Sequence, residues 1–206
     1  MLENRRDRKY IMNKQPKVTE QTKKNIVQAF WKLFKKKRLD QITVKEISDI
    51  AGYNRSTFYE YFTNTRGILE QEEEILLSYI QKNTSEVLFP NLVKGIKPEP
   101  TQLFFYTKRE YLKILLGENG DPQFLRKLKR TIFPVAFKAW GLEQNNSHDG
   151  YVFDFCFSAV LSAMLHWYEN EDLTIDELFV MIWRMLTQGV LSDIKNHEYL
   201  NSLESV

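Results

Sequence analysis

Cysteine is nearly absent from this sequence of 206 residues, in which Cys156 is the only one. A single cysteine excludes an intrachain disulfide, and such sparing use of cysteine is typical of proteins in a reducing compartment. Residues 1–18 are charged and contain no apolar stretch, which argues against a secretory signal. We therefore expect a cytoplasmic protein.

Long apolar runs and turn residues are also scarce. The most apolar segment, 151–168, carries Asp154 and His166, so no membrane span is expected. The sequence has only 8 glycines and 6 prolines, and residues 19–87 show no sustained alternation of apolar and polar side chains. Half-buried strands produce such alternation. The sequence therefore predicts an all-α fold.

The sequence motifs of enzymes are missing as well. It contains no glycine-rich phosphate loop, no nucleophile elbow, and no cysteines or histidines at the spacing of metal ligands. Its three histidines, His148, His166 and His197, are scattered along the second half of the chain. We therefore expect a protein that is not an enzyme and that binds no metal or cofactor.

Charge is distributed very unevenly along the chain. Residues 1–66 contain 16 Lys and Arg against 7 Asp and Glu, a balance of +9, and residues 67–206 contain 13 against 20, a balance of −7. A basic N-terminal third on an acidic body is typical of a polyanion-binding head joined to a body that does not bind polyanions. A merely solvated charge run would give the same balance, so charge alone does not decide between the two.

Residues 43–62 have the pattern of two short helices joined by a turn. Thr43 and Glu46 form an S/T-x-x-E capping box, Gly52 stands where a left-handed C-terminal residue would end the first helix, and Asn54 is a good N-cap for the second. The inward face of the first helix is expected to be Val44, Ile47, Ile50 and Ala51. This arrangement is a helix-turn-helix. An amphipathic helix is expected before it, over 19–37, with Ile26, Ala29, Phe30, Leu33 and Phe34 at helical spacing.

The second helix of this pair, "RSTFYEYF", has two different faces. Phe58 and Phe62 lie four residues apart and are expected to point inward, whereas the opposite face carries Arg55, Tyr59 and further hydroxyl groups. Guanidinium and hydroxyl groups donate hydrogen bonds to phosphates and base edges. Together with the caps, the turn glycine and the basic surroundings, this face indicates a DNA-binding helix rather than tyrosines that only fill space.

The segment "ITVKEISDIAGYNRSTFYEYF" at 42–62, with "IVQAFWKLFKKK" before it and "TNTRGILE" after it, resembles the TetR family of bacterial transcription regulators. The resemblance is specific over residues 19–70. It implies a helix-turn-helix head over 19–66 and a helical regulatory and dimerisation body over 67–206. It also implies a homodimer, usually a repressor, that binds a palindromic operator in double-stranded DNA and is released by a small-molecule inducer.

By this resemblance, Thr43 and Lys45 contact DNA from the first helix of the pair, and Arg55 is the best candidate for reading a guanine. The full set expected at the DNA is Thr43, Lys45, Asn54, Arg55, Ser56, Thr57, Tyr59, Tyr61, Thr65 and Arg66. Two departures from the family pattern bear on this set. Thr65 followed by Arg66 stands where the family usually has lysine, and Glu60 places an acid close to the phosphates. Residues 1–18 are either a basic arm for the minor groove or a solubilising tail.

The acidic body is expected to contain at least four helices. Its last two, over 151–168 and 174–194, are apolar nearly all round, which a solvent-exposed helix is not. The small residues of the first would allow close approach of another helix, so we expect these helices to form a dimer interface as a four-helix bundle. The residues expected there are Ser158, Ala159, Ser162, Ala163, Phe179, Ile182 and Leu186. Burial of both helices within a monomer is the alternative.

The family's body encloses a ligand pocket, and the middle helices of this chain are rich in aromatic residues. A small apolar or aromatic ligand is therefore expected near Phe104, Phe105, Tyr111, Phe133, Phe137 and Trp140, with Asp154 and His166 as polar groups. The same aromatic residues at helical spacing also fit a simple core. A second hypothesis is a TetR-like co-activator that works through a protein partner, since "LLGENGDPQF" at 115–124 is similar to regulators of dihydroxyacetone kinase operons.

Overall fold

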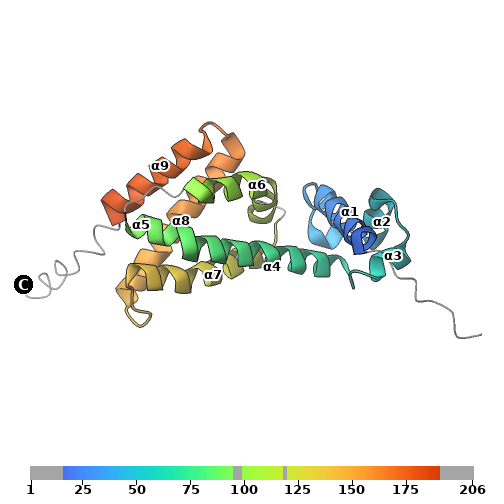
Figure 1. Ribbon diagram of the computed structural model, residues 1–206, viewed down its shortest axis with the longest axis horizontal. Coiled ribbons are helices and arrows are strands. Elements are labelled where there is room, and N and C mark those ends of the chain that lie inside the picture. The colour runs from blue at the N-terminus through green and yellow to red at the C-terminus, as the bar shows by residue number, and fades with distance from the viewer. Residues whose placement is uncertain (1–15, 95–98, 118–119, 191–206) are drawn as a thin grey trace, which may run out of the picture. The chain divides into compact units, whose positions relative to one another are not determined.

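The computed structural model describes residues 16–94, 99–117 and 120–190 (Figure 1). These residues form helices and the turns between them, and none of them lies in a strand. The expected all-α fold is thereby confirmed. The chain divides into two compact units, Met1–Ile68 and Leu69–Val206. Most of the arm expected over 1–18 lies outside the described residues.

The described residues of the first unit form three α-helices, a 3-10 turn and the start of a fourth α-helix. They are α1 (Pro16–Phe34), the 3-10 turn η1 (Leu39–Gln41), α2 (Val44–Ala51), α3 (Arg55–Tyr59) and the first residues of α4 (Thr65–Asn83). α1 packs on α2, and α2 packs on α3. The core side chains are Ile26, Ala29, Phe30, Trp31, Phe34, Ile47, Phe58, Phe62 and Ile68. Aromatic rings meet within it, with 5.3 Å between the centroids of Phe30 and Phe34.

The first unit departs from the expected pattern at both ends of α1, at Ile50 and at the end of α3. α1 begins at Pro16 rather than Thr19 and ends at Phe34 rather than near Lys37, where the backbone amide of Lys36 donates to the carbonyl of Leu33 in a tighter turn. Ile50 was expected to point inward, but it is 47 % exposed, while its neighbour Ser48 is buried. The regular part of α3 ends at Tyr59, although the Phe62 amide still donates to the carbonyl of Phe58 at 3.0 Å.

The second unit contains the rest of α4 and the remaining helices. In order they are the π-helical turn η2 (Thr84–Leu88), α5 (Phe89–Val93), α6 (Glu99–Leu116), α7 (Pro122–Trp140), α8 (Ser147–Asn170), α9 (Ile175–Met185) and a second π-helical turn, η3 (Leu186–Val190). Helices α6, α7, α8 and α9 pack against one another, and α5 packs on α7 (Figure 1). Phe89, Ala136, Phe137 and Phe153 form one buried cluster of this core.

Local sequence signals set several helix ends of the second unit. Pro122 stands in the first turn of α7, where its missing N–H costs no hydrogen bond, and Asp121 caps that helix. Gly141 ends it at a φ of 69°, the left-handed conformation that glycine adopts at little cost. Thr174 and Glu177 form the capping box expected at the start of α9. These caps fix where α7 ends and α9 begins, and hence which of their faces meet α8.

Candidate functional site

The start of α2 is held by the expected capping box. The Glu46 amide donates to the Thr43 hydroxyl at 3.3 Å, and the Thr43 amide and hydroxyl donate to the Glu46 carboxylate at 3.0 and 2.9 Å. The Lys37 ammonium also binds this carboxylate, at 2.6 Å. The hydrogen bond from Lys37 and those from Thr43 lower the pKa of Glu46 to about 2. Lys45, on the same turn, is exposed.

The start of α3 is organised by a single oxygen of Asn54. Its Oδ1 accepts from the Thr57 amide at 2.8 Å, from the Ser56 hydroxyl at 2.6 Å and from the Thr57 hydroxyl at 3.0 Å. The expected N-cap is thereby confirmed. Because both hydroxyl protons point at Asn54, the remaining lone pairs of Ser56 and Thr57 are acceptors. The amino groups of adenine and cytosine are the donors that such acceptors would meet in the major groove.

The two faces of α3 are separated as the sequence predicts. Phe58 is fully buried and packs on Phe62 with 5.9 Å between ring centroids, whereas Tyr59 is 58 % exposed and Arg55 is exposed. The remaining positions expected at DNA vary in exposure: Arg66 is exposed, and Tyr61 and Thr65 are half-buried. A hydrogen bond of 3.0 Å from the side-chain Nδ2 of Asn25 to the Tyr53 hydroxyl ties the turn between α2 and α3 to α1. The helix therefore presents a polar face from a fixed scaffold.

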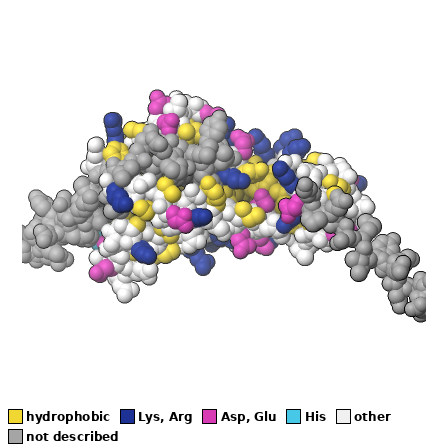
Figure 2. Space-filling model, viewed as in Figure 1, with side chains coloured by type: hydrophobic (Ala, Val, Ile, Leu, Met, Phe, Trp, Pro, Cys, Tyr) yellow, Lys and Arg dark blue, Asp and Glu magenta, His cyan; other side chains and the backbone are white. Residues whose placement is uncertain are grey.

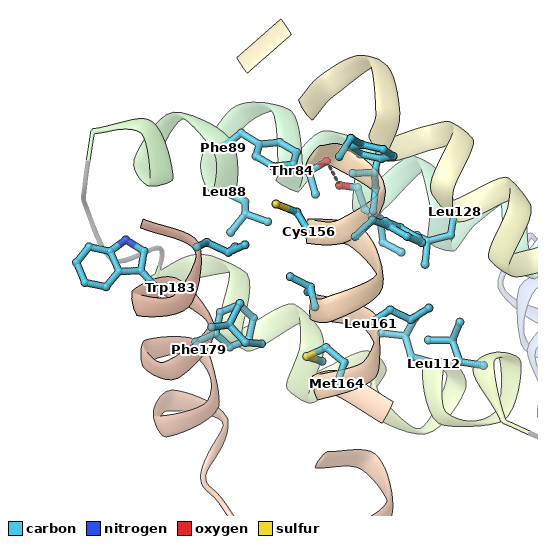
Figure 3. Close-up of a pocket in the computed structure, with 18 of the residues that line it drawn as sticks. Thr84, Leu88, Phe89, Leu112, Leu128, Cys156, Leu161, Met164, Phe179 and Trp183 are labelled. Carbon is cyan, nitrogen blue, oxygen red and sulfur yellow. Dashed lines mark hydrogen bonds between the residues drawn. The ribbon is translucent and has the colours of Figure 1, made fainter. Parts of the chain in front are cut away.

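The second unit contains an apolar cavity of about 160 Å³ (Figure 3). Its walls come from α4, η2, α5, α6, α7, α8, α9 and η3. The lining side chains are Ile80, Thr84, Leu88, Phe89, Leu112, Leu116, Leu128, Ile132, Trp140, Phe153, Cys156, Phe157, Val160, Leu161, Met164, Tyr168, Phe179, Ile182, Trp183 and Leu186. Carboxylates, ammonium groups, guanidinium groups and imidazoles are absent from this set.

Several residues expected in a ligand pocket lie elsewhere in the unit. Asp154 is exposed and binds Lys129 at 2.8 Å, and His166 is exposed beside Asn170, so neither lines the cavity. Each of them stands on α8 at a position that points away from the apolar side. Tyr111 is half-buried and also lies outside the cavity lining.

The expected aromatic residues divide between core and cavity. Phe133 and Phe137 stack at 4.0 Å and pack against the buried cluster rather than lining the cavity. Trp140 does line it, at the end of α7. The side chains of Phe104 and Phe105 lie outside the described residues.

Three residues expected at a dimer interface, Phe179, Ile182 and Leu186, line the cavity. The expectation missed the cavity wall along α8, where Phe153, Cys156, Phe157, Val160, Leu161, Met164 and Tyr168 recur at helical spacing. That spacing is visible in the sequence, but it is equally typical of a solid core.

Among the cavity-lining residues, the indole N–H of Trp140 and the hydroxyl of Tyr168 are buried and have no hydrogen-bond partner within the described part of the chain. Burial raises the pKa of the Tyr168 hydroxyl well above its ordinary value, and it raises the pKa of the Cys156 thiol to about 11. Both groups are therefore neutral at physiological pH.

The small residues of α8 occupy the side opposite the cavity. Ser158, Ala159 and Ser162 are exposed and Ala163 is half-buried. On the same helix, Tyr151 is 79 % exposed and Phe155 is 63 % exposed. Tyr151 and Phe155 lie four residues apart and so share one face of α8, and exposed apolar patches mark interaction surfaces.

Charge and hydropathy of the described residues add two observations. Figure 2 shows acidic and basic side chains interspersed on the visible face of the second unit rather than gathered by sign. None of the described helices is long and apolar enough to cross a membrane. Within the same residues, His, Cys, Asp and Glu nowhere gather in threes that could hold a metal ion.

Comparison with known sequences gives one match in each unit. The family model described as "Bacterial regulatory proteins, tetR family" matches residues 26–71, and the model "Transcriptional regulator C-terminal region" of the same family matches residues 100–188. No curated protein sequence matches the chain.

Solved structures of similar fold include a TetR transcriptional regulator from Streptococcus agalactiae 2603V. It is 21 % identical with a TM-score of 0.60, over 82 % of this chain and 95 % of that one. A tetR-family regulator from Streptomyces coelicolor is 13 % identical with a TM-score of 0.60, over 91 % and 99 %. The dihydroxyacetone kinase operon activator DhaS is 18 % identical with a TM-score of 0.55, over 84 % and 96 %. Since both units match models of one family and the fold agrees, this chain belongs to the TetR family of bacterial transcriptional regulators.

Proposed function

We propose that this protein is a sequence-specific DNA-binding regulator that acts as a homodimeric repressor and is released by a small apolar inducer. The observation that carries the DNA-binding part is the division of α3: Phe58 anchors the helix in the core while Arg55 and Tyr59 are exposed. A short helix that is fixed on one side and bears donors on the other is suited to the major groove.

Each exposed group of the head has a role in this proposal. Arg55 pairs with the two acceptors of a guanine, and Ser56 and Thr57 accept from base amino groups. Tyr59 and Tyr61 donate to phosphates on either side. Thr43, Lys45, Asn54, Thr65 and Arg66 add contacts at the helix ends. The Lys37 ammonium lies 2.6 Å from the Glu46 carboxylate and offsets its negative charge, which would otherwise repel a DNA phosphate near Thr43.

We place the dimer interface on the exposed side of α8. The small side chains of Ser158, Ala159 and Ser162 would permit close helix approach, and Tyr151 and Phe155 would be covered there. A two-fold axis would then present two copies of α3 to successive major grooves of a palindrome. Phe179, Ile182 and Leu186 belong to the cavity wall in this proposal, not to the interface.

The cavity is the proposed inducer site. An inducer lowers DNA affinity only if it binds the DNA-incompetent conformation more tightly. The factor by which the inducer weakens DNA binding then equals the factor by which DNA weakens inducer binding. Filling a cavity lined by six helices and two π-helical turns would shift the packing of those elements. This is the equilibrium on which release from the operator would depend.

The test is selection of bound fragments from the source organism's DNA at about 50 and 200 mM salt. The wild type is compared with an Arg55→Ala, Tyr59→Ala variant. An Arg126→Ala, Tyr79→Ala variant is the control, because it makes the same two changes at exposed positions of the second unit. We expect the wild type and the control to enrich one palindrome and the first variant to lose it. Equal, sequence-blind binding by all three would refute the proposal and would direct the search to a protein partner.

A further inference from the structure

We propose that the turn after α1, residues 35–38, is a second phosphate-binding element of the head. We call it the lysine turn. It contacts the DNA backbone beside the start of α2 and adds affinity without reading bases. Since the proposed function has the head bind DNA, the lysine turn deepens that function and rests on it in this one respect.

Positive charge is concentrated around the end of α1. Residues 32–46 contain six Lys and Arg against two acids. Within the lysine turn, Lys35, Lys36 and Arg38 are exposed. Only three of the ten residues expected at DNA are Lys or Arg, whereas residues 1–66 contain 16. Most of the positive charge of the head therefore lies outside that set.

The two acids of this stretch offset only part of its charge. Glu46 binds Lys37 at 2.6 Å, and Asp40 lies 3.6 Å from Arg38. Both side chains of the second pair are largely exposed, and ion pairs of that kind are weak, so a DNA phosphate can replace Asp40. Lys36 takes part in no ion pair within the described residues.

The Glu46 carboxylate fixes where the lysine turn lies. The Lys37 ammonium binds one of its oxygens, and the amide and hydroxyl of Thr43 bind the other at 3.0 and 2.9 Å. The lysine turn is therefore a direct neighbour of the start of α2. In helix-turn-helix proteins the first helix of the pair crosses the DNA backbone. A phosphate bound at Thr43 would place the next phosphates of the strand within reach of the lysine turn.

The backbone of the lysine turn is well anchored, whereas its ammonium groups extend into solvent. The Lys35 amide donates to the carbonyl of Trp31 at 3.0 Å, and the Lys36 amide donates to that of Leu33 at 2.9 Å. Trp31 itself is buried. An ammonium group on a flexible four-carbon stem acts as a point charge. Such charges suit phosphates, which carry no sequence information, rather than base edges.

The test is the salt dependence of DNA binding by the full chain, measured by fluorescence anisotropy between about 50 and 200 mM salt. Two labelled duplexes are used: the palindrome recovered by the selection proposed above, and a scrambled duplex of the same length and composition. The variant carries Lys35→Gln, Lys36→Gln and Arg38→Gln, and it keeps the contact of Lys37 with Glu46.

Two further variants serve as controls. Lys82→Gln, Arg126→Gln and Lys138→Gln together make the same change in net charge at exposed positions of the second unit. Lys35→Arg with Lys36→Arg keeps the charge of the lysine turn. Urea unfolding of all variants shows whether these lysines serve only the C-terminus of α1, whose carbonyls also favour nearby cations.

Each phosphate contact contributes about 0.9 to the slope of log affinity against log salt. We expect the glutamine variant of the lysine turn to reduce that slope by about 2 to 3 on both duplexes, with the ratio of the two affinities within about twofold of the wild type. The second-unit control and the arginine variant should stay within about 0.5 of the wild-type slope.

An unchanged slope would overturn the proposal, and a loss of stability alone would assign these lysines to the end of α1. A slope change shared by the second-unit control, or a loss confined to the palindrome, would also overturn it. Because the scrambled duplex needs no operator, the lysine turn is tested even if the selection recovers no palindrome. Absence of binding to either duplex would overturn both the lysine turn and the proposed DNA binding.

Discussion

The Lys127 ammonium lies 2.6 Å from one carboxylate oxygen of Glu73 and joins α7 to α4. Glu73 is 1 % exposed, and its other carboxylate oxygen has no partner among the described residues. Burial raises the pKa of Glu73 above its ordinary value of 4.5, although Lys127 opposes the shift. A buried carboxylate held by one cation makes this pair sensitive to loss of either partner.

The first prediction concerns removal of the cation. Lys127→Ala leaves the buried Glu73 carboxylate unpaired, and we expect a loss of about 2 kcal/mol in the free energy of unfolding, reduced from the fully buried case because Lys127 is partly exposed. The measurement is urea unfolding of the purified chain. Lys129→Ala is the matched control, since Lys129 binds Asp154 at 2.8 Å and this carboxylate is exposed. We expect Lys129→Ala to lower the free energy of unfolding by no more than about 0.5 kcal/mol. Equal losses for the two variants would contradict the prediction.

The second prediction concerns pH. Because the folded chain holds the proton of Glu73 more tightly than the unfolded chain does, this group favours folding most at low pH. Its contribution declines as the pH rises from 4.5 towards the raised pKa. Glu73→Gln should flatten that part of the stability profile, measured by urea unfolding across the range, and an unchanged slope would show that Glu73 is not the group responsible.

The third prediction concerns Glu46 at the start of α2, whose pKa is shifted in the opposite direction. The hydrogen bonds from Lys37 and Thr43 lower its pKa to about 2, so its stabilising effect is present above 4.5 and is lost as the pH falls towards 2. Lys37→Met should raise the pKa, measured by NMR titration of the Glu46 side chain. Lys36→Met removes an exposed neighbouring charge and should leave the pKa close to that of the wild type.

Local signals of the sequence predicted more of the fold than distant ones did. Capping boxes at Thr43 and Thr174 and the glycine at Gly52 depend on residues within four positions of each other, so they could be identified from spacing alone. The contact of Glu73 with Lys127 spans 54 positions and leaves no periodic trace. It could not be predicted because it depends on how α4 and α7 pack.

Of the residues expected around a ligand pocket, Trp140 lines the cavity, and most of the other lining residues escaped prediction for a related reason. An apolar side chain at helical spacing has the same sequence pattern whether it fills a core or lines a void, and only the packing of neighbouring helices decides which. Phe179 was expected at a dimer interface, yet it lines the cavity. The two faces of α3 were easier to predict, because the four-residue spacing of Phe58 and Phe62 sets one face apart from Arg55 and Tyr59.

The fourth prediction concerns the base that Arg55 reads in the proposed complex. Arg55→Lys keeps the positive charge but loses the planar pair of donors that matches guanine. We expect binding to non-specific DNA to stay within about twofold, while discrimination at one base pair of each half-site falls by about 1–3 kcal/mol. Competition binding with a set of single-base operator variants measures both quantities. A uniform loss of affinity across the set would instead assign Arg55 to a phosphate.

The fifth prediction concerns the exposed side of α8. Ala159→Trp introduces a large ring where close helix approach is proposed, and a two-fold axis brings in that ring twice. Because Ala159 is exposed, the fold of the single chain should be unaffected. We expect the dimer dissociation constant, measured by analytical ultracentrifugation, to rise about a hundredfold, which corresponds to about 1.4 kcal/mol for each ring. Ser78→Trp, at an exposed serine of α4, should leave association unchanged. If Ala159→Trp remains as dimeric as the wild type, the interface lies on another surface, and the exposure of Tyr151 and Phe155 needs a different partner.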